Sequence, residues 1–539
     1  PARGGNGGLL SDMEREYLIE SGRELAPSPR QKLFEQQLYL YQNMTKPAEY
    51  LFLSYAKVDS AGRTRLPSYL IRVMTGLFPK LHVQTETEEN EGFLAEVESA
   101  EDGLDDFAGL LRKYREGSLE KTALPKLRVL QKVYDTPDAE KIREAAFYRY
   151  EPGKLSRQAA DSLYAERNQG SVSRLELFAS CAYAHFLRYG LELMPRAEYT
   201  FEAVDFGSVY HGVLELFERS LKEDDISLRT LSEEEMEQRL WDAFSVLTKE
   251  YGETILYSSA RNERRIRQMH RLLLRSVRTM QYQMQKGSFE PAYFEQKFRM
   301  KGVFPLVGKI DRIDIRREDD AIYLKVMDYK SGRKQFSLDD VYYGLSMQLP
   351  VYMNAAVSFL QERYPQTTII PAAMLYYRLQ KPIIEIEGTK AEEEIEAEIR
   401  KQMKPDGLLL GEDCVLTMLD QGFSTDSDVM RVGRKKDGSF KAASQVISQE
   451  DLGLLLSYTQ KKAEQMMQQM AEGEIAVTPL KTGNHTSCDF CEYREVCRMD
   501  ERIDGYRLQE LTPLTDEERK EAMERAVYGG SEEGHRDEK

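Results

Sequence analysis

Three short runs of alternating apolar and polar residues, at 293–300, 306–317 and 321–330, constrain the fold of this chain more than any other feature. They read YFEQKFRM, LVGKIDRIDIRR and AIYLKVMDYK, and charged or glycine-containing segments separate them. The segment before them, 261–285, has apolar residues at helical spacing, so the periodicity changes here from 3.6 residues to 2. Strands joined by such short connections pair with their neighbours along the chain. We therefore expect an antiparallel meander beside helices, in an α/β domain.

Other elements are expected from the same kinds of pattern. Residues 1–150 read as mainly helical, with a strand at LFLSYAKVD (51–59) and a helix that Pro67 and Ser68 open. Ser173 is the expected N-cap of the helix that follows it. After the meander we expect a helix at 341–364, a strand at 372–379, a hairpin turn at Asp437-Gly438, a long helix at 449–472, and a charged terminal helix with a disordered tail.

The charge pattern gives two opposing indications about partners. A net charge of −16 argues against nucleic acid, because an acidic surface repels phosphate. Residues 261–301, however, hold eight Arg and three Lys against three Glu. This stretch is either a solvated helix face or a patch that tracks phosphates. No apolar run reaches about 18 residues, so we expect no membrane-spanning helix.

Two carboxylates and a lysine on adjacent predicted strands suggest metal-assisted chemistry. Asp328 and Lys330 are two residues apart, so their side chains share a face about 6.6 Å apart along the strand. Asp311, on the strand before, can approach Asp328 across the sheet. Carboxylates hold Mg²⁺ or Mn²⁺, and such an ion lowers the pKa of its bound water. The lysine can orient that water or stabilise charge on phosphorus, which is what phosphodiester hydrolysis requires.

Each of these residues also has an ordinary structural interpretation. Asp-x-Lys on a strand is common at exposed edges, although the apolar YLKVM before it favours a buried strand that ends at a cleft. His211 lies on a predicted helix and is either a ligand or a packed histidine. Gln348 and Tyr352 are one helical turn apart and face one groove, as they also would on any amphipathic helix.

The cysteines are spaced like ligands of a metal centre. Cys488, Cys491 and Cys497 form C-x₂-C-x₅-C, and Cys181 lies 307 positions before the first of them. Four thiolates suit an iron–sulfur cluster, whereas a structural zinc could also recruit His185 or His485. Spacing alone leaves iron and zinc open. The fifth cysteine, Cys414, is expected to be a buried free thiol.

The order of these motifs carries a family resemblance. His211, Glu295, Gly308-x-x-Asp311, Asp328-x-Lys330 and Gln348-x-x-x-Tyr352 resemble the RecB-like branch of the PD-(D/E)XK nucleases. The frame of SRLELFASCAYAHF upstream and CDFCEYREVC downstream is similar to the AddB (RexB) family of the bacterial AddAB helicase–nucleases, in which an iron–sulfur cluster joins the two ends of the nuclease domain. The match runs from about 165 to 500.

The resemblance implies a role for each matching residue. His211, Asp311, Asp328 and the backbone carbonyl of Tyr329 would bind Mg²⁺ or Mn²⁺. Lys330 would be catalytic, with Gln348 and Tyr352 beside the site on the substrate path. Glu295 is the weakest assignment, because an exposed strand glutamate explains it equally well. The ligands of a [4Fe–4S] cluster, with zinc as the alternative, would be Cys181, Cys488, Cys491 and Cys497.

The resemblance also implies an architecture and a function. We expect a PD-(D/E)XK core, a mixed sheet flanked by helices, at 165–500, a mainly helical remnant of a helicase-like region at 1–150, and a charged helix and tail at 501–539. The chain would be the C-terminal part of a longer protein. It would cut single-stranded DNA, on the 5′-ended strand, beside an AddA-like helicase partner during double-strand-break repair by recombination in the bacterial cytoplasm.

Two other functions remain open. One is a stand-alone iron–sulfur exonuclease of the CRISPR-associated type, although its members are much shorter. The other is a non-catalytic DNA-binding scaffold, which would not require the set of Asp311, Asp328 and Lys330. No G-x-x-x-x-G-K-[ST] loop is present, so the sequence predicts no ATPase site in this segment.

Overall fold

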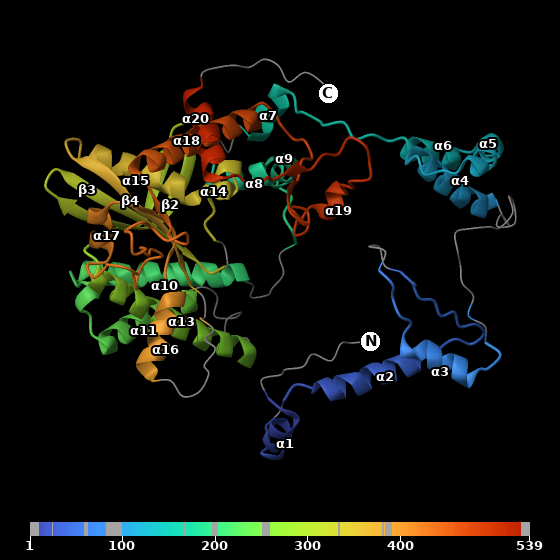
Figure 1. Cartoon of the computed structure of the whole chain (residues 1–539), viewed down its shortest axis with the longest axis horizontal. Helices are drawn as coiled ribbons and strands as arrows, with labels where there is room; N and C mark the ends of the chain where they lie inside the picture. Colours follow the sequence, from blue (N-terminus) through green and yellow to red (C-terminus); the bar gives the residue numbers. More distant parts are fainter. Residues whose placement is uncertain are drawn as a thin grey trace. The chain divides into compact units, whose positions relative to one another are not determined.

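The chain folds into two compact units, Pro1–Ala146 and Phe147–Lys539, in the computed structural model (Figure 1). The structure describes residues 10–23, 25–58, 63–81, 83, 100–164, 169–196, 203–250, 259–332, 335–379, 382 and 391–529. Within these residues, no helix combines the length and the apolar character needed to cross a membrane. The tail expected at the C-terminus lies largely outside the described residues, which end at 529.

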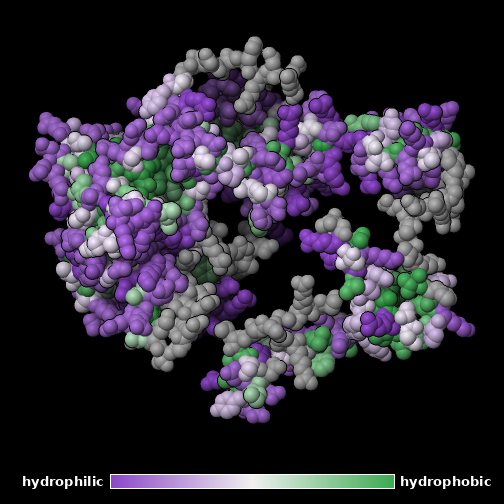
Figure 2. All heavy atoms as spheres, viewed as in Figure 1, coloured by the Kyte–Doolittle hydropathy of each residue, from purple (hydrophilic) through white to green (hydrophobic). Residues whose placement is uncertain are grey.

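The first unit is built from helices. They are α1 (Asp12–Glu20), α2 (Pro29–Thr45), α3 (Tyr69–Leu77), α4 (Ala100–Arg115), α5 (Leu124–Val133) and α6 (Pro137–Ala146). Phe107, Leu127 and Leu130 are the centre of a small core shared by α4, α5 and α6. By contrast, α3 buries no residue, and Figure 2 shows hydrophobic side chains on the surface around it.

The strand expected at 51–59 is wrong. Residues 51–56 belong to no strand, and Val58 makes only an isolated bridge to Thr64. Phe52 is 89% exposed, so the apolar residues of this run pack against little within the described residues. A strand needs a partner and a packed face, and composition alone supplies neither. The helix expected after Pro67 is confirmed as α3, and the Ser68 hydroxyl caps its first turn.

The second unit contains the sheets and most of the helices. Its helices are α7 (Arg157–Tyr164), α8 (Val172–Ser180), α9 (Ala182–His185), α10 (Ala203–Glu223), α11 (Glu233–Glu250), α13 (Ala260–Lys286), α14 (Leu338–Tyr343), α15 (Gln348–Arg363), α16 (Glu392–Gln402), α17 (Asp413–Leu419), α18 (Gln449–Ala471), α19 (Arg494–Cys497) and α20 (Asp516–Tyr528). Its strands are β1 (Glu290–Met300), β2 (Leu306–Glu318), β3 (Ala321–Lys330), β4 (Thr368–Arg378), β5 (Asp406–Leu410), β6 (Val446–Ile447), β7 (Leu480–Thr482), β8 (His485–Thr486) and β9 (Gln509–Glu510).

The central sheet has the order β1-β2-β3-β4-β5-β6. The first three strands form the expected antiparallel meander. Because β4 runs parallel to β3 and antiparallel to β5, the sheet is mixed, as we expected from the family resemblance. A parallel neighbour needs a crossover connection, and here α14 and α15 provide it. A second, three-stranded sheet has the order β8-β7-β9.

Helices cover both faces of the central sheet (Figure 1). On one face α15 packs against β4 and β3, with α18 and α20 outside it. On the other face lie α10 and α13, where the Tyr377 hydroxyl of β4 donates to the Ser276 carbonyl of α13 over 3.0 Å. Ile322, Leu324 and Val326 of β3 are at most 1% exposed, so this strand lies at the centre of the core. Burial of each such side chain contributes about 1.5–3 kcal/mol.

Helix boundaries differ from the expectations at two places. Ser171, not Ser173, is the N-cap of α8, and its hydroxyl accepts from the Arg174 amide. The helix expected at 341–364 is divided into α14 and α15, because Gly344 has φ +84° and ends the first of them. A left-handed glycine closes a helix at low steric cost. The turn at Asp437-Gly438 is present, with Gly438 at φ +84°.

Candidate active site

Three potential metal ligands meet where α10, β1 and β2 come together. His211, Glu295 and Asp311 each offer a ligand atom, and these three atoms lie within 4.8 Å of one another. Nδ1 of His211 is 3.2 Å from Oδ2 of Asp311. Glu295 lies on β1 between residues paired with Arg312 and Ile310, which places it across the ladder from Asp311. An imidazole and two carboxylates form a donor set that fits Mn²⁺ or Mg²⁺.

Glu295 is held in an unusual backbone conformation. Its φ is +50°, a region that costs a non-glycine residue about 1–3 kcal/mol and that recurs at functional sites. Its side chain is only 10% exposed and is paired with Lys309. The alternative of an exposed strand glutamate is therefore wrong. Lys309 itself was not predicted, although its place two residues before Asp311 on the same strand indicates the same face.

Asp328, Lys330 and Gln348 form a second group at the end of β3. Nζ of Lys330 lies 2.7 Å from Oδ2 of Asp328 and donates to Oε1 of Gln348 over 2.5 Å. The Gln348 side-chain amide donates to Oδ1 of Asp328 over 2.6 Å and to the Tyr352 hydroxyl over 3.0 Å. Asp328 is 1% exposed and Tyr352 8%. The structure thus brings together all four residues that the sequence placed on the β3 strand and the following helix.

Tyr329 connects the two groups. Its backbone amide donates to Oδ2 of Asp311 over 2.8 Å, and its neighbours in sequence are Asp328 and Lys330. Its ring lies edge-on to the His211 ring, with centroids 6.1 Å apart. Asp328 is not in the 4.8 Å group, because its oxygens point to Lys330 and Gln348.

The glycine of the motif is required by close packing. Gly308 pairs with Phe298 across the β1–β2 ladder. A Cβ atom at Gly308 would lie 2.6 Å from the Phe298 ring, which is an overlap with a rigid group. Phe298 in turn contacts the Tyr352 ring edge-on at 5.6 Å. Because Gly308 has no side chain, the Phe298 ring can lie directly over β2 at this position, three residues before Asp311.

Burial and neighbouring charges shift the pKa values of the site. Burial, reinforced by the negative charge of Asp311, raises the pKa of Asp328 to about 7. Burial also raises the pKa of Glu295. For His211, burial acts to lower the pKa, but the hydrogen bond and charge of Asp311 outweigh it and the pKa is raised. A carboxyl group that keeps its proton near neutral pH must lose that proton before it binds a cation. Metal binding at this site should therefore release protons.

The four cysteines of the predicted cluster line one cavity. Its walls include Cys181 from the α8–α9 junction and Cys488, Cys491 and Cys497 from the C-terminal part of the unit. No three sulfurs of the described cysteines lie within 4.8 Å of one another. Around the cavity, the Ser487 hydroxyl donates to the Ser180 carbonyl over 3.2 Å. The two ends of the second unit therefore meet at this cavity.

Cys414 does not match its expected environment. It was expected to be buried, but it is exposed near the start of α17. The apolar residues that follow it, Val415 and Leu416, are fully buried instead. The face of α17 that packs on the core begins one residue after Cys414. In a helix of seven residues, apolar periodicity does not show which of two adjacent residues is buried.

The fold and the site define the class of protein. Residues 169–498 match the PD-(D/E)XK nuclease superfamily, and the chain belongs to that superfamily. The expected α/β nuclease core, with a mixed sheet between helices, is confirmed.

Similarity to individual proteins is more specific. The chain is similar to proteins from three bacteria that are each named as the B subunit of an ATP-dependent helicase/deoxyribonuclease. Identity is 35% for Lachnoclostridium phytofermentans, over 96% of this chain and 46% of the relative. It is 32% for Bacillus mycoides (98% and 47%) and 30% for Clostridium kluyveri (95% and 46%). The resemblance to the AddB family is thereby confirmed, and the chain spans less than half the length of these relatives.

Proposed function

We propose that this chain hydrolyses phosphodiester bonds of single-stranded DNA with Mg²⁺ or Mn²⁺, as the nuclease part of a helicase–nuclease. The observation that carries the proposal is the convergence of His211, Glu295 and Asp311 beside the Asp328–Lys330 pair. One group offers ligands for a hard cation, and the other offers a lysine held at a carboxylate. The relatives' shared name, which includes deoxyribonuclease, supports DNA as the substrate.

The residues would divide the chemistry among them. His211, Glu295 and Asp311 would hold the ion, with Asp328 and the carbonyl of Tyr329 completing its ligands. The ion, when bound, polarises the phosphoryl oxygen and lowers the pKa of water. Lys330 would orient the attacking water, because the Gln348 side chain of α15 accepts a hydrogen bond from its Nζ and so fixes it. Tyr352 would keep the amide of Gln348 turned toward Asp328.

A basic surface provides a path for the DNA backbone. Arg261, Arg264, Arg267 and Arg271 are exposed on the N-terminal half of α13. Arg265 of the same helix lies over the Phe206 ring of α10, 5.9 Å from its centroid. A Cβ at the next residue, Gly207, would be 3.3 Å from the Ser331 hydroxyl, immediately after Lys330. The basic half of α13 thus contacts α10, the helix that carries His211, and we propose that it guides a single strand toward the site in a sequence-tolerant way.

We further propose that the cysteine cavity holds a [4Fe–4S] cluster. A single tetrahedral zinc, with Zn–S bonds of about 2.3 Å, would hold its sulfurs about 3.8 Å apart. The four cysteines line one cavity in which no three of their sulfurs lie within 4.8 Å of one another, and this arrangement suits several iron atoms better than one zinc. The cluster would be structural, because it would join segments 307 positions apart at the ends of the second unit.

The cellular setting of the proposal comes from the relatives. Their names describe one part of an ATP-dependent helicase and deoxyribonuclease. We propose an AddA-like helicase partner that supplies unwound DNA, cleavage of the 5′-ended strand, and a cytoplasmic role in recombination repair. Neither rival function receives a specific supporting observation from the site.

The test is Mg²⁺-dependent degradation of labelled single-stranded DNA by the purified chain with its helicase partner. Lys330→Ala should reduce the rate by at least about 100-fold, because the water loses its orienting cation. Lys436→Ala, an exposed lysine on a distant turn, is the matched control and should keep the wild-type rate. Labels at the 5′ and 3′ ends report polarity. A wild-type rate for Lys330→Ala would overturn the proposal.

A further inference from the structure

We propose that Glu218 and Tyr329 are positioning residues that set the metal affinity of the active site, by holding α10, and with it His211, against β2 and β3. The inference rests on the proposed function, because it concerns the same metal. Neither residue offers a side-chain ligand to the ion in this arrangement. Both act through the placement of α10, and so of His211.

Glu218 is a buried carboxylate on the helix that carries His211. The two residues are seven positions apart, which is two turns, so they lie on one face of α10 about 10.5 Å apart. Oε1 of Glu218 accepts from the Tyr329 hydroxyl over 2.8 Å and from Nη1 of Arg312 over 2.9 Å. Glu218 is 5% exposed. The carboxylate therefore attaches α10 to β3 and to β2 through one oxygen atom.

Tyr329 contacts Glu218, His211 and Asp311, each through a different group. Its hydroxyl binds Glu218, its ring contacts the His211 ring, and its backbone amide donates to Asp311. A shift of the tyrosine side chain would therefore move the imidazole and the carboxylate relative to one another. Besides this ring contact, the 3.2 Å approach of His211 to Asp311 ties the imidazole to the strands. The Glu218–Tyr329 hydrogen bond thus restrains the ligand geometry from the helix side.

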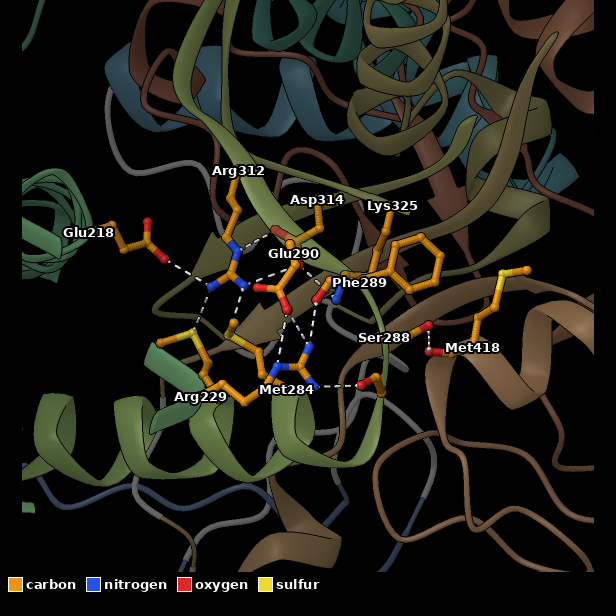
Figure 3. Close-up of polar contacts among 12 residues, drawn as sticks. Glu218, Arg229, Met284, Ser288, Phe289, Glu290, Arg312, Asp314, Lys325 and Met418 are labelled. Carbon is orange, nitrogen blue, oxygen red and sulfur yellow. Dashed lines mark hydrogen bonds and ion pairs between the residues drawn. The ribbon is translucent and has the colours of Figure 1, made fainter. Parts of the chain in front are cut away.

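Arg312 anchors Glu218 from the strand side. Its guanidinium donates to both oxygens of Asp314, over 2.6 and 3.1 Å, and Lys325 of β3 is 2.8 Å from the same carboxylate (Figure 3). Figure 3 shows Glu218 directed at Arg312 from the opposite side of the guanidinium. Arg312 is 1% exposed and Asp314 is fully buried.

The energetics favour a geometric role for this network. Buried ion pairs seldom stabilise a fold more than well-packed apolar residues would, because desolvation offsets the attraction. Their hydrogen bonds are directional, however, so they select one position of α10 on the sheet. A metal site requires its ligands to be held within about 0.5 Å of the productive geometry. Partners that orient metal ligands are worth about 10- to 100-fold in metal affinity.

A double-mutant cycle on Mn²⁺ binding tests the proposal. Isothermal titration would compare the wild-type chain, Tyr329→Phe, His211→Ala and the double variant. Tyr329→Phe removes only the hydroxyl, and should raise the Kd for Mn²⁺ about 10-fold or more. In the His211→Ala background the same change should have no further effect, because the residue acts through His211. Thermal unfolding of each variant shows whether it is folded.

Two control variants separate positioning from general stability. Tyr458→Phe removes a buried hydroxyl that donates to the Tyr342 carbonyl over 2.7 Å, away from the site, and should leave Mn²⁺ affinity unchanged. Glu218→Gln keeps an acceptor for Tyr329 and Arg312, and should weaken Mn²⁺ binding less than Glu218→Ala. Wild-type affinity in Tyr329→Phe, or an equal loss in both backgrounds, would overturn the inference. Absence of Mn²⁺ binding by the wild-type chain would instead overturn the proposed function, and the inference with it.

Discussion

The side-chain amide of Gln348 donates to Asp328 over 2.6 Å while its carbonyl oxygen accepts from Lys330 over 2.5 Å. One residue of α15 thus fixes both the Asp328 carboxylate and the Lys330 ammonium group at the end of β3. Its own position is fixed at the helix start, where the Met347 amide donates to Glu176 of α8 over 2.9 Å. The helix after the meander therefore contributes directly to the geometry of the site.

Gln348→Ala should slow cleavage of single-stranded DNA by about 100-fold, the scale expected when a catalytic group is misplaced. Lys330 would keep its pairing with Asp328 but would lose the hydrogen bond from its Nζ to Gln348. Gln361→Ala, an exposed glutamine on the same helix, is the control. Equal rates for the two variants would show that Gln348 is only part of an amphipathic helix.

The affinity for Mn²⁺ should rise with pH up to about pH 7 and then level off. Burial raises the pKa of Asp328 to about 7, so below that pH the carboxyl keeps a proton that the ion must displace. Each pH unit below 7 should then weaken binding by about tenfold through this carboxyl alone, and by more because His211, whose pKa is also raised, must lose a proton as well. Isothermal titration at pH 6, 7 and 8 measures this. An affinity independent of pH across this range would contradict the proposed role of Asp328.

His185 should make the second unit lose stability in acid. The imidazole is fully buried and accepts from Nε of Arg174 over 2.9 Å, and burial lowers its pKa to about 3. The unfolded chain takes up a proton near pH 6.5, and the folded chain does not. The stabilising contribution is therefore complete above pH 6.5 and is lost as the pH falls from 6.5 to 3, by up to about 1.4 kcal/mol per pH unit.

Urea unfolding followed by Trp241 fluorescence checks this dependence, because the single tryptophan lies in the second unit. His185→Gln retains an acceptor for Arg174 but removes the titrating group. Between pH 7 and 5 the free energy of unfolding of the wild-type chain should fall more steeply than that of the variant. Parallel pH curves would show that His185 does not titrate as its burial requires.

Removal of one cavity cysteine should remove the iron. Protein purified without air should contain iron and absorb broadly near about 400 nm, as thiolate-bound clusters do. Cys491→Ser should lose this absorbance and should unfold at a lower temperature, because the clamp between the two ends of the unit is lost. Cys414→Ser, at the exposed fifth cysteine, is the matched control. Zinc in place of iron, or full iron in Cys491→Ser, would contradict the cluster assignment.

Local patterns were sufficient for the parts of the fold that depend on neighbours in sequence. The meander β1–β2–β3 follows from alternation and short connections, and the Asp328–Lys330 pair from strand periodicity. The helices α13 and α18 lie where 3.6-residue periodicity placed them. The motif order was also sufficient to group His211 with Asp311, although they are 100 positions apart.

Features that depend on distant partners were not predictable in this way. The run at 51–59 has strand composition but pairs with no strand in the described part of the chain. The alternation of β2 suggests only that Arg312 and Asp314 share a face, and does not show that Glu218 of α10 lies opposite them. The positive φ of Glu295 likewise could not be predicted, because the sequence around it, EQKF, resembles that of an ordinary exposed strand.

If the carboxylates that β2 and β3 contribute to the site support DNA hydrolysis, Asp328→Asn should abolish it. The substitution keeps the shape of the side chain and removes its charge. The measurement is the Mg²⁺-dependent rate of single-stranded DNA cleavage, with thermal unfolding as the control for folding. The expected loss in a folded protein is at least about 1,000-fold, equivalent to about 4 kcal/mol in the activation barrier. A folded Asp328→Asn variant that cuts at the wild-type rate would contradict it.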